Sequence, residues 1–303
     1  MKKLLSTVIV AMGLGALVGG VSAPALAEEK GGPIQHLDWE FDGPFGHFDT
    51  EQLQRGYVVF RQLCASCHSM SRVKFRHLAQ IHRDPANPAS AVIQQGIGLD
   101  LAFIENEAAQ IVVDDVDPIS GQTFTRQGSL EDTFPWPFDN KQTAAAAFGK
   151  APPDFSRLAL ALADKGGADY IYSLLLGYDA EKSAELTAAA QAQNPDAGDV
   201  HYNPVFGGQI AMPPPIREDG QVSYPEGVKE EYMTMESMAA DVTAFMVWGA
   251  DPTMIQRKQL GVIVILFMLV LTGVSWLAYR RIAVKVNKQL QEEGGGPWDR
   301  DDH

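Results

Sequence analysis

Cysteine is scarce in this chain: only two of its 303 residues are cysteine. Two thiols alone cannot complete a zinc site built on thiolates. Basic residues are also few, with 24 Lys and Arg against 38 Asp and Glu and a formal net charge of −14. Because nucleic-acid phosphates require a basic surface, we expect no nucleic-acid partner. The acidity favours a basic protein partner, and simple solubility is the alternative explanation.

Charge is absent from two long stretches, of which the first lies at the N-terminus. Residues 4–21 are apolar and rich in Gly and Ala; they follow Lys2 and Lys3 and precede the small-x-small sequence Ala25-Leu-Ala27. This order is typical of a secretory signal peptide. We therefore expect residues 1–27 to be removed after export; an uncleaved anchor is the alternative.

The second uncharged stretch, residues 260–279, lies near the C-terminus and has about the 20-residue length that crosses a bilayer. The basic residues that follow it are Arg280, Arg281, Lys285 and Lys288. By the positive-inside rule, residues 282–303 form a cytoplasmic tail behind an anchor at 256–281, and residues 28–255 form an exported domain. A buried helix of a soluble protein is the alternative.

Both cysteines belong to one motif, Cys64-Ala-Ser-Cys67-His68. Its spacing allows two thiols to add to the vinyl groups of one haem while the adjacent imidazole binds the iron. A thioredoxin-like redox pair needs a βαβ setting, which the sequence lacks, and half of a zinc site needs further thiols. The motif therefore predicts one covalent c-type haem held by Cys64, Cys67 and His68, and it leaves no cysteine for a disulfide.

The segment before this motif, residues 52–63, has the apolar spacing of a helix. Its stripe consists of Leu53, Tyr57, Phe60 and Leu63. Gly56, four residues before Phe60, predicts a point where another helix crosses closely. Such a helix is typical of the N-terminal part of small c-type cytochromes.

The sixth ligand decides what a haem does, because a Met sulfur suits electron transfer whereas an open iron suits gas binding. Met212 lies in Gln209-Ile-Ala-Met-Pro-Pro-Pro215, where three prolines favour an extended loop without amide donors. We predict Met212 as the ligand. Met233, Met235, Met238 and Met246 have the spacing of a core helix instead. The rival histidines are His36, His47, His77, His82 and His201.

Further segments resemble the cytochrome c1 family in their order along most of the chain. They are Trp39-Glu-Phe-Asp-Gly-Pro-Phe-Gly46, Gln54-Arg-Gly56, the haem motif, Phe134-Pro-Trp-Pro137, Pro152-Pro-Asp-Phe-Ser156, Gly166-Gly-Ala-Asp-Tyr170, Tyr202-Asn-Pro-Val-Phe206 and Ala211-Met-Pro-Pro214. The resemblance implies a mainly α fold: a class I cytochrome c-like haem domain with long loop insertions plus one C-terminal transmembrane helix.

The same resemblance implies axial ligation by His68 and Met212, and haem contacts from Pro153 and Tyr170. Tyr170 matches a family tyrosine near a haem propionate. The family arginine shortly before it has no counterpart here, where the chain reads Ala163-Asp-Lys165, so Lys165 and Arg157 are the possible replacements. Phe60, a third contact candidate, stands where many relatives have tyrosine.

The function implied is that of an electron relay in the bacterial inner membrane, with its haem domain in the periplasm. The chain would accept electrons from a Rieske iron–sulfur protein and donate them to a soluble cytochrome c, within a dimeric complex that contains cytochrome b and couples ubiquinol oxidation to proton translocation. It would have no independent active site. A free electron shuttle, an oxidase subunit and a haem-based gas sensor are the alternatives.

Acidic surface near the haem would attract the basic acceptor. We expect residues 82–140 to be irregular and to provide this surface. The docking candidates there are Glu105, Glu107, Asp114 and Asp115. Residues 180–193, rich in Ala, Glu and Gln, predict a short surface helix.

Overall fold

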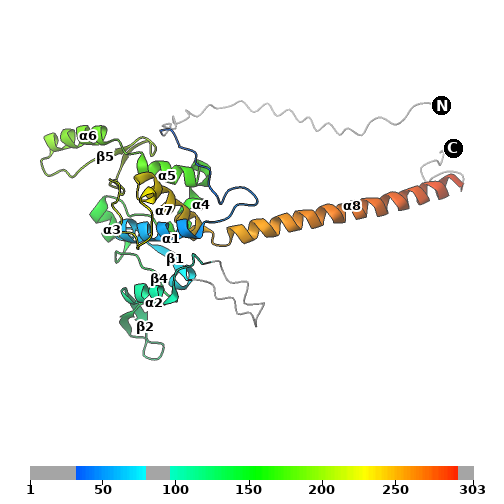
Figure 1. Cartoon of the computed structure of the whole chain (residues 1–303), viewed down its shortest axis with the longest axis horizontal. Helices are drawn as coiled ribbons and strands as arrows, with labels where there is room; N and C mark the ends of the chain where they lie inside the picture. Colours follow the sequence, from blue (N-terminus) through cyan, green and yellow to red (C-terminus); the bar gives the residue numbers. More distant parts are fainter. Residues whose placement is uncertain (1–31, 80–95, 293–303) are drawn as a thin grey trace, which may run out of the picture. The chain divides into compact units, whose positions relative to one another are not determined.

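The structure is a computed structural model that describes residues 32–79 and 96–292 (Figure 1). The predicted signal peptide and the last part of the predicted tail, from residue 293, lie outside the described residues. The helices are α1 Thr50–Val59, α2 Leu101–Ala109, α3 Lys141–Phe148, α4 Leu158–Ala161, α5 Ala168–Leu176, α6 Ala180–Gln193, α7 Met235–Ala250 and α8 Met254–Glu292. The strands are β1 Met70–Lys74, β2 Val112–Val116, β3 Thr123–Gln127, β4 Thr133–Phe134, β5 His201–Asn203 and β6 Gly208–Ile210. The mainly α prediction is confirmed.

Helix α1 begins at a cap and ends in a wider turn. The Asp49 carboxylate accepts a hydrogen bond from the Glu51 amide at 3.0 Å, which satisfies one free N–H of the first turn. From Phe60 to Cys64 the chain continues as a π-helical turn, closed by a 2.8 Å bond from the Ala65 amide to the Phe60 carbonyl. The predicted helix over 52–63 is therefore present, but its last turn is wider than an α-helix. Such turns occur often at functional sites.

Helices α1 and α7 cross at Gly56, as the sequence predicts (Figure 1). A Cβ atom added to Gly56 would come within 2.7 Å of the Asp241 carbonyl carbon and 2.8 Å of the Phe245 Cβ. Beside this contact, the buried Arg55 guanidinium donates two hydrogen bonds to the Asp241 carboxylate, at 2.8 and 3.1 Å. The crossing thus combines a close backbone approach with a paired buried charge.

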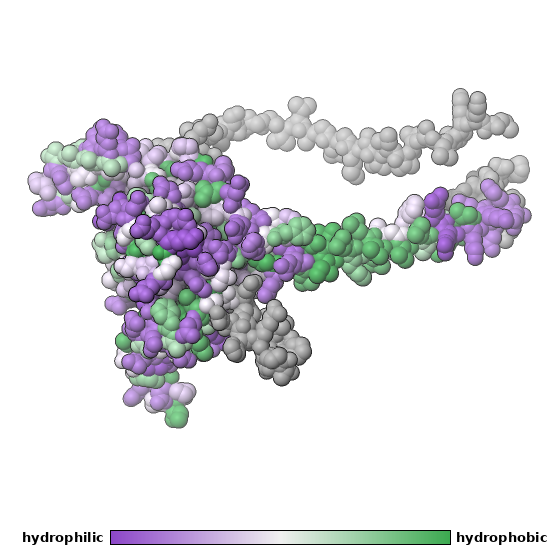
Figure 2. Space-filling model, viewed as in Figure 1, coloured by the Kyte–Doolittle hydropathy of each residue, from purple (hydrophilic) through white to green (hydrophobic). Residues whose placement is uncertain are grey.

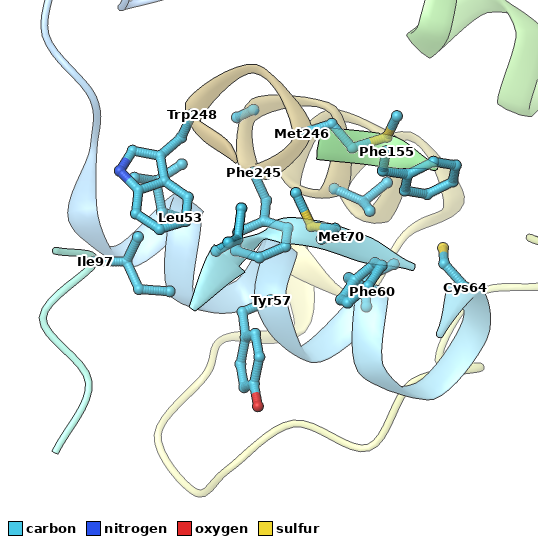
Figure 3. Close-up of a cluster of buried hydrophobic side chains, with 14 of the residues drawn as sticks. Leu53, Tyr57, Phe60, Cys64, Met70, Ile97, Phe155, Phe245, Met246 and Trp248 are labelled. Atoms are coloured by element: carbon cyan, nitrogen blue, oxygen red, sulfur yellow. The ribbon is translucent and has the colours of Figure 1, made fainter. Parts of the chain in front are cut away.

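An aromatic core fills the space around this crossing (Figure 3). The Phe60 ring lies 5.6 Å from that of Phe245 and 6.1 Å from that of Phe155. Phe134, on β4, packs edge-on against Phe60 because β4 pairs with β1, which directly follows the haem motif. Of the four methionines predicted in the core, Met238 and Met246 on α7 are buried, and Met235 is partly buried against the core. Met233 lies before the helix and is only half-buried.

The segment expected to be irregular, residues 82–140, contains ordered elements in its described part from residue 96. Helix α2 is capped by Asp100, whose carboxylate accepts from the Phe103 amide at 3.0 Å. Strands β2 and β3 form an antiparallel hairpin in which Val112 faces Gln127 and Val116 faces Thr123. The prediction of irregular chain is wrong here. The hairpin buries no residue fully, so its strands lack the apolar alternation that marks a half-buried sheet.

Helix α8 is the one helix of the described residues whose length and composition suffice to cross a membrane. Its 39 residues extend over about 58 Å, compared with about 30 Å for a hydrocarbon core, so its ends can reach beyond the lipid. Figure 2 shows its middle as an apolar band between polar ends. Near its start, the Lys258 ammonium donates to the Phe41 carbonyl at 2.7 Å.

Candidate haem site

The haem motif forms a tight turn directly after the π-helical turn. The amides of Cys67 and His68 both donate to the Cys64 carbonyl, at 3.0 and 2.9 Å. Both thiols are free, and burial together with the neighbouring Cys67 raises the pKa of Cys64 to about 12. Cys64 therefore lies as a neutral thiol among the core side chains of Figure 3, near Phe60 and Phe155. Two free thiols on one turn are the set that thioether attachment requires.

The buried His68 ring is held in one tautomer. Its Nδ1 lies 2.8 Å from the Pro153 carbonyl oxygen, which can only accept, so Nδ1 carries the proton. The ring also stacks on Phe155, with centroids 4.1 Å apart. Burial lowers the pKa of His68, which keeps the imidazole neutral. The lone pair is therefore on Nε2, for which the described residues provide no hydrogen-bond partner. A neutral imidazole with its second nitrogen bound to a carbonyl is a typical metal ligand.

Pro153 is fixed because the segment around it is bound to the chain just after His68. The Phe155 amide donates to the Ser69 carbonyl at 2.8 Å. The Asp154 carboxylate accepts from the Ser69 hydroxyl at 2.6 Å and from the Ser71 amide at 2.9 Å. Partial burial acts to raise the pKa of Asp154, but these bonds and those from Ser156 lower it to about 2. Pro153 thus orients His68 through its carbonyl, a role that the sequence does not reveal.

Met212 lies in an extended loop whose carbonyl groups are bound by nearby side chains. The Tyr178 hydroxyl donates to the Met212 carbonyl at 3.0 Å. Downstream, the Arg217 guanidinium donates to the Pro214 carbonyl at 3.1 Å, and Ile216 is buried in the core. Met212 itself is half-buried. The loop is therefore anchored by side chains from outside it and, before Met212, by strand β6, whose last residue Ile210 pairs with His201 of β5.

The remaining predicted haem contacts lie in separate places. Phe60 is fully buried, and its contact with Phe155 connects it to the His68 ring. Tyr170 is buried on α5, and the Lys165 ammonium lies 5.6 Å from the centre of its ring. Sequence reasoning missed the Trp136 indole N–H, which is buried and has no acceptor among the described residues. A buried free donor of this kind suits an acidic group of a ligand.

Three of the rival histidines, His36, His47 and His77, have other partners in the part of the chain that the structure describes. The His36 ring is 2.7 Å from the Asp169 carboxylate, which also accepts from the Trp39 indole. His77 accepts from the Lys74 amide at 3.2 Å. His82 lies outside the described residues.

Two of the four predicted docking residues are committed to ion pairs. The four are Glu105, Glu107, Asp114 and Asp115. Glu105 and Asp114 are exposed, on α2 and β2. The Glu107 side chain is only 17% exposed and accepts from the Arg61 guanidinium at 3.0 Å. Asp115 accepts from Arg126 at 2.6 Å. Of the four candidates, Glu105 and Asp114 therefore offer a partner negative charge that is unpaired among the described residues.

The residues present fit a c-type haem. Two free thiols, a neutral imidazole with an available nitrogen, and a half-buried thioether form the donor set that such a group uses. The aromatic rings around the motif provide an apolar setting for the porphyrin.

Comparison with known proteins places this site in a family. Residues 39–286 match the Cytochrome C1 family. The chain is 35% identical to cytochrome c1 of Rhodospirillum rubrum, over 90% of this chain and 94% of that protein. It is 34% identical to the mitochondrial cytochrome c1 haem protein of Saccharomyces cerevisiae, over 89% of this chain and 75% of that protein. It is 33% identical to cytochrome b/c1 of Bradyrhizobium diazoefficiens, over 93% of this chain but 40% of that longer protein. The chain therefore belongs to the cytochrome c1 family, whose members are electron-transfer subunits of cytochrome bc1 complexes.

Proposed function

We propose that this chain carries one covalent haem and passes single electrons from a Rieske iron–sulfur protein to a soluble cytochrome c. The observation that carries the proposal is the His68 ring, whose Nδ1–H is bound to the Pro153 carbonyl while Nε2 stays available beside two free thiols. When bound, the haem supplies the one-electron iron couple. The chain has no independent active site, and ubiquinol oxidation coupled to proton translocation is the work of the whole complex.

The residues of the site have distinct roles in this proposal. Cys64 and Cys67 would hold the porphyrin through thioether bonds, and the His68 Nε2 would bind the iron. The Pro153 carbonyl, by accepting the Nδ1 proton, keeps the His68 ring in one orientation and increases the basicity of Nε2. Met212 would supply the second iron ligand, and its sulfur would raise the reduction potential and close the iron to other ligands. Phe60 belongs to the apolar wall that keeps water away.

The arrangement in the membrane is also part of the proposal. Residues 1–27 direct export, residues 28–255 form a periplasmic domain, residues 256–281 cross the inner membrane and residues 282–303 stay in the cytoplasm. Basic residues directly after the apolar part of α8 support this orientation. The Bradyrhizobium diazoefficiens relative, named cytochrome b/c1, supports cytochrome b as the neighbour of the anchor. A dimeric complex is proposed by family analogy alone.

Met212→Leu tests the ligand assignment. Leucine has a similar volume but no sulfur, so covalent haem should remain while the reduction potential falls and carbon monoxide binds to the reduced protein. Met233→Leu is the matched control, because Met233 is also half-buried but lies outside the Met212 loop. The measurements are a redox-titrated optical spectrum and a carbon monoxide difference spectrum of the purified complex. An unchanged potential in Met212→Leu would show that another residue is the ligand.

A further inference from the structure

Tyr178 follows α5 and reaches across to the loop of the proposed ligand. Its hydroxyl donates to the Met212 carbonyl at 3.0 Å and lies 3.5 Å from the Pro213 carbonyl. Burial raises the pKa of Tyr178, so the hydroxyl keeps its proton at neutral pH. The sequence gives no signal for this contact, since the two residues lie in separate loops.

The position of Tyr178 is itself well supported. Just before it, the Asn203 side-chain amide donates to the Leu174 carbonyl at 2.8 Å. Just after it, the Asp179 amide donates to the Tyr202 carbonyl at 3.1 Å. Helix α5 packs against α7, the helix that crosses α1. Tyr178 is therefore held by α5 and by β5, the strand that pairs with β6 just before Met212.

Beyond the end of β6 at Ile210, the chain that carries Met212 depends on such outside support. Residues 213–215 are prolines and have no amide donors, so they cannot form a helix or a strand ladder. The Arg217 and Gln221 side chains bind the carbonyls of Pro214 and Pro215, which lie downstream of the ligand residue. Among the described residues, Tyr178 is the one side chain that hydrogen-bonds the peptide group of Met212 itself.

We propose that Tyr178 is a positioning residue that holds the Met212 thioether on the iron and so sets how readily an external ligand replaces it. This rests on the proposed ligation by Met212. A carbonyl fixed by Tyr178 restricts the backbone that carries the thioether, so less conformational entropy is lost when the Fe–S bond forms. Without the hydroxyl, the loop is freer and the sulfur leaves more easily.

Replacing Tyr178 with phenylalanine isolates the hydroxyl. The purified full-chain complex in its oxidised form is titrated with imidazole, and displacement of methionine is followed by loss of the charge-transfer absorption of Met-ligated ferric haem. One hydrogen bond of ordinary strength corresponds to about a fivefold change in an equilibrium constant. We therefore expect Tyr178→Phe to bind imidazole about fivefold more tightly than the unaltered protein.

Tyr224→Phe is the matched control. The Tyr224 hydroxyl is also buried but has no hydrogen-bond partner among the described residues, so its loss should leave imidazole affinity unchanged. A second check is the pair Met212→Leu and Met212→Leu/Tyr178→Phe, which should bind imidazole equally because no thioether is left to hold.

The outcomes separate this proposal from the one on which it rests. If the charge-transfer absorption is present and Tyr178→Phe binds imidazole like the unaltered protein, the positioning role is wrong. If the unaltered protein lacks that absorption, ligation by Met212 is wrong. Should Tyr178→Phe not retain haem, Tyr178→Gln replaces it: its side chain ends short of the tyrosine hydroxyl position, so the same increase is expected, and an unchanged affinity overturns the role.

Discussion

Replacing Gly56 with alanine should destabilise the domain although alanine favours helices. In an open helix, the change would stabilise by up to about 1 kcal/mol. Here the new Cβ would lie 2.7 Å from the Asp241 carbonyl carbon and 2.8 Å from the Phe245 Cβ. The first of these is backbone and cannot rotate away, so α1 and α7 must move apart.

The expected loss of stability in Gly56→Ala is the cost of overpacking minus the gain in helix propensity. Overpacking a tight core costs about 1–3 kcal/mol, and a rigid neighbour places Gly56→Ala near the upper end. Subtracting the gain in helix propensity leaves a net loss of about 2 kcal/mol. If the separation also breaks the Arg55–Asp241 pair, the loss rises further, because an unpaired buried charge costs about 3–5 kcal/mol.

Denaturant unfolding of the purified full chain in detergent, followed by tryptophan fluorescence, measures this loss as a lower midpoint. Gly198→Ala is the matched control: Gly198 is exposed, and a Cβ there would meet nothing within 4 Å, so a change within about 0.5 kcal/mol is expected. A midpoint for Gly56→Ala equal to that of the control would refute the argument that the two helices depend on this close approach.

Three further predictions concern charges. Asp241→Asn should lower the free energy of unfolding by about 3–5 kcal/mol in the same assay, because Arg55 is left buried without its partner; an effect below 1 kcal/mol would mean that solvent reaches it. Asp154 has a pKa of about 2, below the value of about 3.9 for an unfolded aspartate. Its ionised form therefore stabilises the fold above about pH 4 and loses this effect towards pH 2, so the stability gap between wild type and Asp154→Asn should shrink over that interval; a constant gap contradicts this. Finally, Glu105→Gln/Asp114→Asn should slow association with a basic soluble cytochrome c at low salt in stopped-flow measurements, with no difference at high salt; an unchanged salt dependence removes the docking proposal.

Local patterns predicted a large part of this fold. The stripe of α1, the helix crossing at Gly56, the core methionines of α7 and the surface helix Ala180–Gln193 all follow from residues a few positions apart. Each is recognisable because a helix repeats its contacts every three to four residues.

Contacts between distant loops were not predictable in this way. The bond from His68 to the Pro153 carbonyl and the bond from Tyr178 to Met212 join segments far apart in the chain. Loops have no repeating pattern of apolar residues from which contacts could be predicted. Every residue has a backbone carbonyl, so residue type does not indicate which carbonyl accepts a hydrogen bond. The β2–β3 hairpin was missed because neither of its faces is fully buried, so apolar and polar residues need not alternate along its strands.

The two sides of the site therefore differ in how the chain specifies them. The side of His68 begins in a local motif, because the thiols and the imidazole share one turn, and several hydrogen bonds attach the distant segment around Pro153 to that turn. The side of Met212 depends on tertiary structure: the β5–β6 ladder ends at Ile210, and beyond it the Tyr178 hydroxyl binds the peptide of the proposed ligand residue. Under the proposed ligation, changes outside the haem motif would alter the second ligand while the motif itself still held the cofactor. On the proposed ligation by Met212, the packing that supports Tyr178 would affect how readily an external ligand replaces the thioether.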